Sequence, residues 1–256
     1  MQLQTDDSSV ESGKWLTNWM PLDVSSIQAT PWLSRILHEP FEISGGFGRA
    51  NAELHEVINQ WKTSPWHLTQ STLRCITARE FNQFCNPADC RPRGNKSDLL
   101  SQSSLDLVGR LVSALPESVR DVHVYLDRHG GRRYYADAIS TNWPDLDDWS
   151  VVSESARCSR YRFVVGQRRL DLSFSVQGDR FTPVAMSSLH AKWLREIAML
   201  AVNDYFESKW NASTQIIDRP FRPTAGYPVD ADRFVADIDE IRRREGIDLF
   251  DLVRSR

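Results

Sequence analysis

An acidic residue at the end of an apolar strand is the feature of this sequence that most directly suggests chemistry. The run VHVYLDRHGGRRYY covers residues 122–135, and its β-branched and aromatic start predicts a buried strand. Asp127 ends this strand, where open α/β sheets place their ligands. Arg128, Arg132 and Arg133 follow it, and their positive charge suits a phosphate-bearing substrate. The alternative is an ordinary loop in which Asp127 serves as a turn residue or a helix cap.

A line of polar residues along a predicted long helix is the second candidate. The helix is expected over residues 183–209, and it is mostly apolar. Ser188, Lys192 and Glu196 are spaced by four residues, so they share one side of it. The alternative is a Lys–Glu surface pair that contributes a few tenths of a kcal/mol. Lys before Glu is the less favourable order for such a pair, and the sequence leaves both interpretations open.

The segment PTAGYPVDADRF, residues 223–234, is the third candidate. A turn of Gly226, Tyr227 and Pro228 that leads into an Asp-capped helix can present the tyrosine ring at a loop tip. Rings presented in this way stack on sugars or bases. The alternative is a tyrosine that packs down onto the core.

These residues need a framework of helices and strands to position them. Residues 161–165 and 170–176 alternate apolar and polar side chains around Gly166-Gln167, which predicts a hairpin. Thr77 and Glu80 form a capping-box pattern at the start of a short helix. Further strands are expected at 73–76 and 150–153, and further helices at 31–38, 51–61, 77–84, 97–115, 134–140, 230–243 and 249–254. Together these elements predict an α/β protein.

Composition excludes several classes of protein. No apolar run among the 256 residues approaches the length of a membrane span, and the start lacks a signal-peptide pattern, so we expect a cytoplasmic protein without a membrane partner. The four cysteines lack the paired spacing of a zinc site. A net charge of −3 does not suggest a general nucleic-acid binder. The arginines at 157, 160, 162, 168 and 169 are interpreted as a solvated hairpin face.

The three motifs, in this order, resemble the ribonuclease HII family over roughly residues 72–245. The resemblance implies a ribonuclease H-like fold, a mixed sheet flanked by helices. It also implies Mg²⁺ or Mn²⁺ as cofactor and an RNA–DNA hybrid as partner. In the family's pattern Asp127 and Glu196 correspond to metal ligands, although Glu196 stands where the family has Asp. Lys192 would contact the scissile phosphate, and Tyr227 would stack on a sugar. Arg128, Arg132, Arg133, Ser188 and Gly226 are the further expected nucleic-acid contacts.

The sequence departs from this family at its beginning. The family opens with an antiparallel meander whose first strand carries a Gly-x-Asp-Glu-x-Gly-x-Gly motif, and the nearest imitation here is Glu42 before Gly45-Gly46-Phe47-Gly48. Two-metal hydrolysis needs carboxylates to hold cations about 3.5–4 Å apart. Three explanations are open: Asp171 or Asp179 supplies the missing acids, the chain is a truncated enzyme, or it is a degenerate relative. We favour truncation or degeneration. Residues 1–70 form a poorly patterned, partly helical region, and residues 71–256 form the expected ribonuclease H-like domain.

Three functions follow as hypotheses. The first is a metal-dependent endonuclease that cleaves the RNA strand of RNA–DNA hybrids. The second is a non-catalytic relative that binds nucleic acid, and the third is an interaction domain without a nucleic-acid role. If the first holds, the carboxylates of Asp127 and Glu196 should lie about 4–7 Å apart, near enough to share a metal. Lys192 should point into the same cleft and Tyr227 should line its edge.

Overall fold

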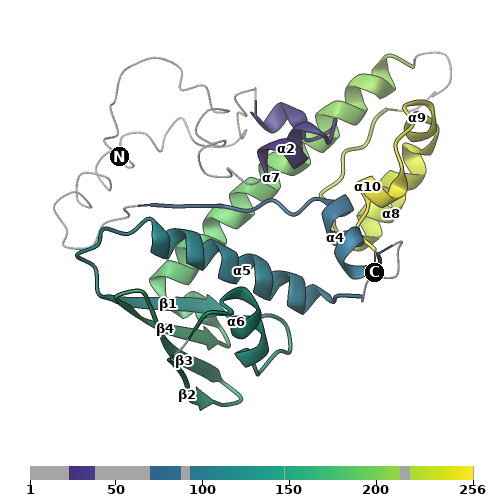
Figure 1. Cartoon of the computed structure of the whole chain (residues 1–256). Coiled ribbons are helices and arrows are strands. Elements are labelled where there is room, and N and C mark those ends of the chain that lie inside the picture. The colour runs from purple at the N-terminus through teal and green to yellow at the C-terminus, as the bar shows by residue number, and fades with distance from the viewer. Residues whose placement is uncertain (1–22, 38–69, 88–92, 147, 214–219, 256) are drawn as a thin grey trace, which may run out of the picture. The chain divides into compact units, whose positions relative to one another are not determined.

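The computed structural model describes residues 23–37, 70–87, 93–146, 148–213 and 220–255 (Figure 1). The chain is mixed α/β, and four strands form one mixed sheet in these ranges. The predicted helix at 51–61 and the Glu42 region lie outside the described residues. No helix in the described part of the chain is long and apolar enough to cross a membrane. The helices and strands, in chain order, are α2 (Val24–Gln28), η1 (Ser34–Leu37), α4 (Ala78–Cys85), α5 (Lys96–Ser113), β1 (Asp121–Asp127), α6 (Ala136–Asn142), β2 (Trp149–Glu154), β3 (Cys158–Val165), β4 (Arg168–Ser175), η2 (Gly178–Arg180), α7 (Thr182–Asn211), α8 (Pro228–Asp237), α9 (Asp239–Arg244) and α10 (Leu249–Leu252).

The chain divides into two compact units. We call the first the helical unit; it comprises Met1–Cys75 and Arg195–Glu245. The second, the sheet unit, comprises Ile76–Leu194 and Gly246–Arg256. The boundary between the units falls within α7. The division at residue 70 that the sequence suggested stays a prediction.

The sheet unit is built on strands in the order β1-β4-β3-β2. β1 runs parallel to β4, and β4, β3 and β2 form an antiparallel meander. The predicted hairpin is confirmed as β3 and β4, and Gly166 at its turn adopts a φ of 60°, which glycine tolerates without a steric penalty. The predicted strands before Asp127 and around residue 150 are confirmed as β1 and β2. The expectation that the first of them is buried was wrong, because β1 is at the edge of the described sheet and its residues are exposed or half-buried.

One face of this sheet carries the core of the unit. Strand side chains alternate between faces, so Leu170, Leu172 and Phe174 of β4 point into the core, and Asp171 and Ser173 point to the opposite face. α5 and α6 lie over the core face (Figure 1). α5 contributes side chains spaced for one face of a helix, namely Leu105, Val108 and Val112.

The start and the end of the sheet unit meet at α4. As predicted, the Thr77 side chain caps this helix by accepting a hydrogen bond from the Glu80 backbone N–H (3.2 Å). Buried Asn82 donates to the backbone carbonyls of Phe250 (2.7 Å) and Val253 (2.8 Å), and so fixes α10. The predicted strand at 73–76 was wrong, because these residues belong to no helix or strand and are not part of the described sheet.

The helical unit packs α2, η1, α8 and α9 with the C-terminal part of α7. Phe206 of α7 lies at its centre, and its ring meets those of Trp32 (6.4 Å) and Phe234 (5.6 Å). α2 was not predicted from the sequence. Of the helix expected at 31–38, the described residues 31–37 form only the single 3-10 turn η1. The helix expected at 230–243 is two helices, α8 and α9, that meet at Ile238.

Candidate functional site

Asp127 is the last residue of β1, and its side chain is exposed. Its Oδ1 accepts a hydrogen bond from the backbone N–H of Gly178 (2.9 Å), the first residue of η2. A Cβ at Gly178 would lie 3.0 Å from the Asp127 Cα, so only glycine allows this close approach without displacement. Asp127 therefore does not cap the turn that follows it; it joins β1 to the segment after β4.

The arginines near Asp127 are engaged by protein partners. Arg128 donates to the backbone carbonyls of Ser155 (2.9 Å) and Ala156 (2.6 Å) in the turn between β2 and β3. Arg132 forms an ion pair with Asp98 of α5. Arg133 is exposed. Two of the three guanidinium groups thus stabilise the fold locally, and a role for any of them as a phosphate ligand stays a prediction.

His129, in the turn after β1, is a buried polar residue of the sheet unit. Its ring nitrogens form hydrogen bonds with the hydroxyls of Ser101 (2.9 Å) and Ser104 (3.3 Å) on α5. Its backbone N–H donates to the Tyr135 hydroxyl (2.9 Å). Burial, and secondarily the nearby charge of Arg132, lowers the pKa of His129 to about 4. The imidazole is therefore neutral at pH 7 and fixes the turn against α5.

Two tyrosines extend this buried network. The backbone N–H of Tyr135 donates to the Tyr161 hydroxyl (2.8 Å), which in turn donates to Glu154. Burial and the Glu154 carboxylate raise the pKa of Tyr161. The Tyr135 ring stacks on Phe174 with the ring centroids 3.6 Å apart. Many residues of the run 122–135 thus stabilise the fold of the sheet unit.

The polar line along the long helix is present as predicted. Ser188, Lys192 and Glu196 all lie in α7, and Lys192 and Glu196 are exposed. The Glu196 carboxylate accepts from Arg195 (2.6 Å), which differs from the Lys–Glu pair considered from the sequence. Asp127 and Lys192 belong to the sheet unit, whereas Glu196 belongs to the helical unit. That these three side chains lie close together stays a prediction.

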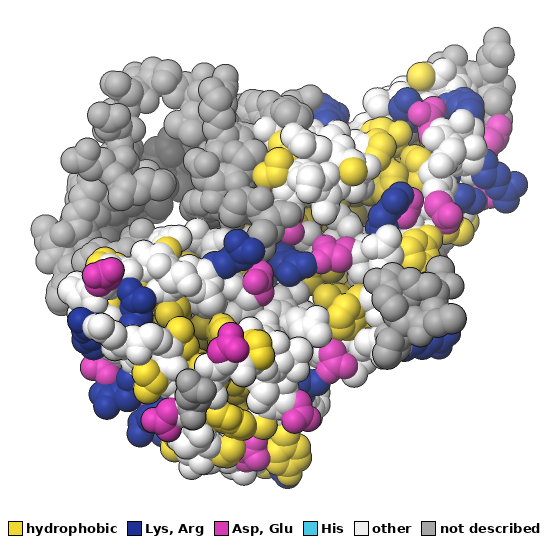
Figure 2. All heavy atoms as spheres, viewed as in Figure 1, with side chains coloured by type: hydrophobic (Ala, Val, Ile, Leu, Met, Phe, Trp, Pro, Cys, Tyr) yellow, Lys and Arg dark blue, Asp and Glu magenta, His cyan; other side chains and the backbone are white. Residues whose placement is uncertain are grey.

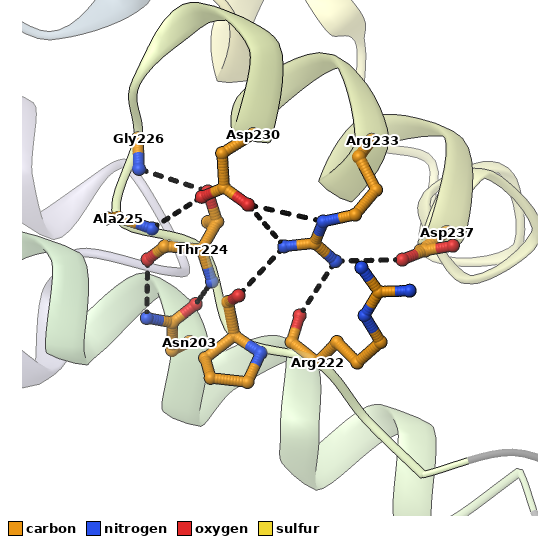
Figure 3. A network of polar contacts seen from close by, with 9 residues as sticks. Asn203, Arg222, Thr224, Ala225, Gly226, Asp230, Arg233 and Asp237 are labelled. Atoms are coloured by element: carbon orange, nitrogen blue, oxygen red, sulfur yellow. Dashed lines mark hydrogen bonds and ion pairs between the residues drawn. The ribbon is translucent and has the colours of Figure 1, made fainter.

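The loop before α8 is held by a network of hydrogen bonds around one carboxylate, as Figure 3 shows. Asp230 accepts hydrogen bonds from the Thr224 hydroxyl (2.6 Å) and from the Ala225 backbone N–H (2.7 Å). These bonds, together with one from Arg233, lower the pKa of Asp230 to about 2. The expected Asp-capped helix was wrong in one detail. Tyr227 occupies the cap position, and Asp230 binds back to the loop from inside the helix.

Two further side chains fix this loop from either side. Asn203 of α7 makes a pair of hydrogen bonds with the backbone of Thr224, one to its carbonyl and one from its N–H (both 2.9 Å). Arg233 donates to Asp230 (2.6 Å), to Asp237 (2.9 Å) and to the carbonyl of Pro223 (2.8 Å). Neither residue was predicted from the sequence, although the spacing of Asp230, Arg233 and Asp237 by three and four residues was a usable signal of helical ion pairs.

The fixed loop presents Tyr227 to solvent. Gly226 adopts a φ of 73°, which favours glycine, and a Cβ there would lie 2.9 Å from the sulfur of Met199, so the Met199 side chain would have to shift. The next residue, Tyr227, is 63% exposed. The Arg195 guanidinium lies over its ring, 4.8 Å from the centroid, and also donates to the carbonyl of Ala225. The predicted tyrosine at a loop tip is confirmed, and Arg195 is a neighbour that the prediction did not include.

The acids suggested as substitutes for the missing family motif, Asp171 and Asp179, are not grouped with other potential metal ligands in the described part of the chain. Asp171 is buried, and its two oxygens accept from Arg162 (3.0 and 3.3 Å). Asp179 is an exposed residue of η2. Among the described residues, no group of three or more acidic, histidine or cysteine side chains is arranged to hold a metal ion.

The chain was compared with known proteins at three levels. No protein-family model, no curated protein and no solved structure matches it.

Proposed function

We propose that this chain binds nucleic acid as a relative of ribonuclease HII, with an RNA–DNA hybrid as its ligand. The observation that carries this proposal is the exposed Tyr227 on its fixed loop, with Arg195 beside the ring. An exposed aromatic ring offers a stacking surface for a sugar or a base, and an adjacent guanidinium offers a positive charge to the phosphate. Because Asp230 and Asn203 already fix the loop, the loop should lose little conformational entropy on binding.

The molecule has no excess of positive charge, so we expect nucleic acid to bind at a local site. Figure 2 shows basic and acidic side chains interspersed on the face in view, and the net charge is −3. A protein of this kind attracts phosphates through particular groups, since it lacks the general positive charge typical of nucleic-acid-binding domains. Arg195 beside Tyr227 is such a group, and its guanidinium also pairs with the Glu196 carboxylate (2.6 Å).

A ribonuclease H-like fold is part of the proposal. The mixed sheet flanked by helices and the acid at the carboxyl end of β1 support it. The order of the strands in the chain speaks against it, because the meander here follows the strand of Asp127, whereas the family begins with its meander.

Cleavage of the RNA strand is the second candidate, and it rests on the exposed carboxylates of Asp127 and Glu196. Carboxylate oxygens suit Mg²⁺ and Mn²⁺, and these two residues would hold such an ion if they met. Two carboxylates are fewer than a pair of cations requires, and one of them already accepts a hydrogen bond from Gly178. The described residues therefore support binding better than hydrolysis.

The binding proposal is tested by fluorescence anisotropy with a labelled RNA–DNA hybrid. We expect Tyr227→Ala to weaken binding about 10-fold, because stacking on an aromatic side chain contributes roughly 1–3 kcal/mol per base. Tyr134→Ala is the matched control, because Tyr134 is also exposed (61%) but lies in the sheet unit. Affinity should also fall steeply as salt rises. Binding that ignores both salt and Tyr227→Ala, or no binding at low salt, contradicts the proposal.

The cleavage candidate is tested separately with the same hybrid and added Mg²⁺ or Mn²⁺. If it is correct, the RNA strand is cut and Asp127→Asn abolishes the cut. No cleavage, or cleavage that Asp127→Asn leaves unchanged, excludes it and leaves the binding proposal standing.

A further inference from the structure

The sheet unit has a pocket on the face of the sheet opposite to its core. The cavity measures about 230 Å³, and it lies over β1, β3 and β4 beside η2. Its walls include two arginines, an aromatic pair, a buried acid and small polar side chains, among them Tyr125, Arg160, Asp171, Ser173, Arg180 and Phe181. All of these residues belong to the sheet unit.

Strand alternation explains why polar groups gather there. Leu172 and Phe174 face the core, so Asp171 and Ser173 of β4 face the other way. The register pairs Arg160 of β3 with Ser173, which brings the arginine to the same face. The interpretation of the arginine-rich hairpin as merely a solvated face was therefore incomplete.

The pocket is positively charged. The negative charge of Asp171 is compensated by Arg162, which binds both of its oxygens. Arg160 and Arg180 also line the pocket, and neither forms an ion pair with an acid among the described residues. Two guanidinium groups without acidic partners, over a face of small hydroxyl side chains, suit a phosphate group.

The same pocket has an aromatic wall. The rings of Tyr125 and Phe181 are stacked, with centroids 4.8 Å apart and planes at 28°. The Arg180 guanidinium lies 4.8 Å from the Phe181 centroid, so the charge and the aromatic surface adjoin. A planar ring next to a phosphate would match both features.

We propose that this pocket binds a nucleoside monophosphate, with its phosphate on Arg160 and Arg180 and its base against the wall of Tyr125 and Phe181. The cavity volume of about 230 Å³ is below the range of about 300–1,000 Å³ usual for drug-sized ligands, so we expect a ligand no larger than one nucleotide. The inference goes beyond hybrid binding. The proposed hybrid contact is Tyr227 in the helical unit, so either site can fail without the other.

The test is isothermal titration calorimetry of the full chain with adenosine monophosphate, inorganic phosphate and adenosine. We expect adenosine monophosphate to bind more tightly than either fragment. Arg160→Gln and Arg180→Gln should each weaken it about 10-fold or more, as expected for losing a hydrogen bond to a charged group. Ser173→Leu should weaken it as well, because the larger side chain fills the pocket without changing its charge. Arg110→Gln is the control, since this exposed arginine lies on α5, which covers the other face.

Each variant is first checked by circular dichroism and thermal melting, and Arg160 and Arg180 are exposed residues whose replacement should leave the fold intact. Adenosine monophosphate binding that is no tighter than phosphate binding would overturn the role of the aromatic wall. Binding that survives both arginine replacements and Ser173→Leu, or no binding to the wild-type chain, would overturn the site.

Discussion

Acidification should destabilise the sheet unit through His129. The pKa of this buried imidazole is lowered to about 4 in the folded state, from 6.5 when exposed. Above pH 6.5 the His129 imidazole is neutral in the folded and in the unfolded state, and the fold has its full stability. As pH falls from 6.5 towards 4, the imidazole is protonated in the unfolded state but stays neutral in the folded state. The free energy of unfolding then drops by up to 1.36 kcal/mol per pH unit, which amounts to about 2 kcal/mol between pH 7.5 and pH 5.

The assay is amide hydrogen exchange of β1, corrected for the intrinsic effect of pH on exchange. Wild-type protein should lose about 2 kcal/mol of protection between pH 7.5 and 5. His129→Gln removes the titrating group, so its protection should be nearly constant over this interval. An NMR titration of the His129 ring in the wild-type chain checks the same point without a mutation, with an expected midpoint near 4. Equal pH dependence in the two proteins, or a midpoint near 6.5, would refute the reasoning.

Three further predictions concern other parts of the chain. Gly226→Ala should destabilise the helical unit by about 1–2 kcal/mol in chemical denaturation, because of the positive φ and the close Met199 sulfur. A denaturation midpoint equal to that of the wild-type chain would contradict this expectation. Asn82→Ala should cost about 1–3 kcal/mol and speed hydrogen exchange at residues 248–255, because it leaves two backbone carbonyls without their donor; unchanged exchange there contradicts it. The carboxyl carbon of Asp230 should titrate near pH 2 by NMR, so the loop is intact above about pH 4 and loosens as pH falls through 2; a midpoint at 3.8 would contradict the hydrogen-bond network.

Local patterns in the sequence predicted local structure well. The alternation on either side of Gly166-Gln167 predicted the hairpin, and the apolar spacing around the Ser188–Glu196 line predicted α7. The Thr77–Glu80 pattern predicted the start of α4. Each of these signals depends on residues within one or two turns of one another, where backbone preference and side-chain periodicity act directly.

The partners of the arginines and of His129 could not be predicted in this way. Arg128 finds its acceptors 27 and 28 residues away, and Arg132 finds Asp98 at a distance of 34 residues. His129 meets serines of α5 that precede it by 25 and 28 residues. Only the fold brings such groups together, so a run that suggested a phosphate site from its composition serves in part as internal support. The short strand predicted at 73–76 failed for a related reason, because four residues cannot specify a pairing partner.

The candidate site was predicted in part. Gly226 and Tyr227 were identified from a local turn signal, and the exposed ring confirms that signal. Arg195 was not assigned a role, because its position over the ring depends on how α7 meets the loop. The pocket residues Arg160 and Arg180 were missed for the same reason, since a pocket over a sheet face requires the strand order as well as the alternation.

The most direct test of the central claim is to identify the residues that touch a bound hybrid. An RNA–DNA hybrid that carries photoreactive bases is cross-linked to the protein at low salt, and the adducts are mapped by mass spectrometry. We expect adducts in the peptide that contains residues 222–233, with Tyr227 itself as the main site, and we expect Tyr227→Ala to abolish them. Adducts confined to other segments, or none above the level seen with a non-binding control protein, would contradict it.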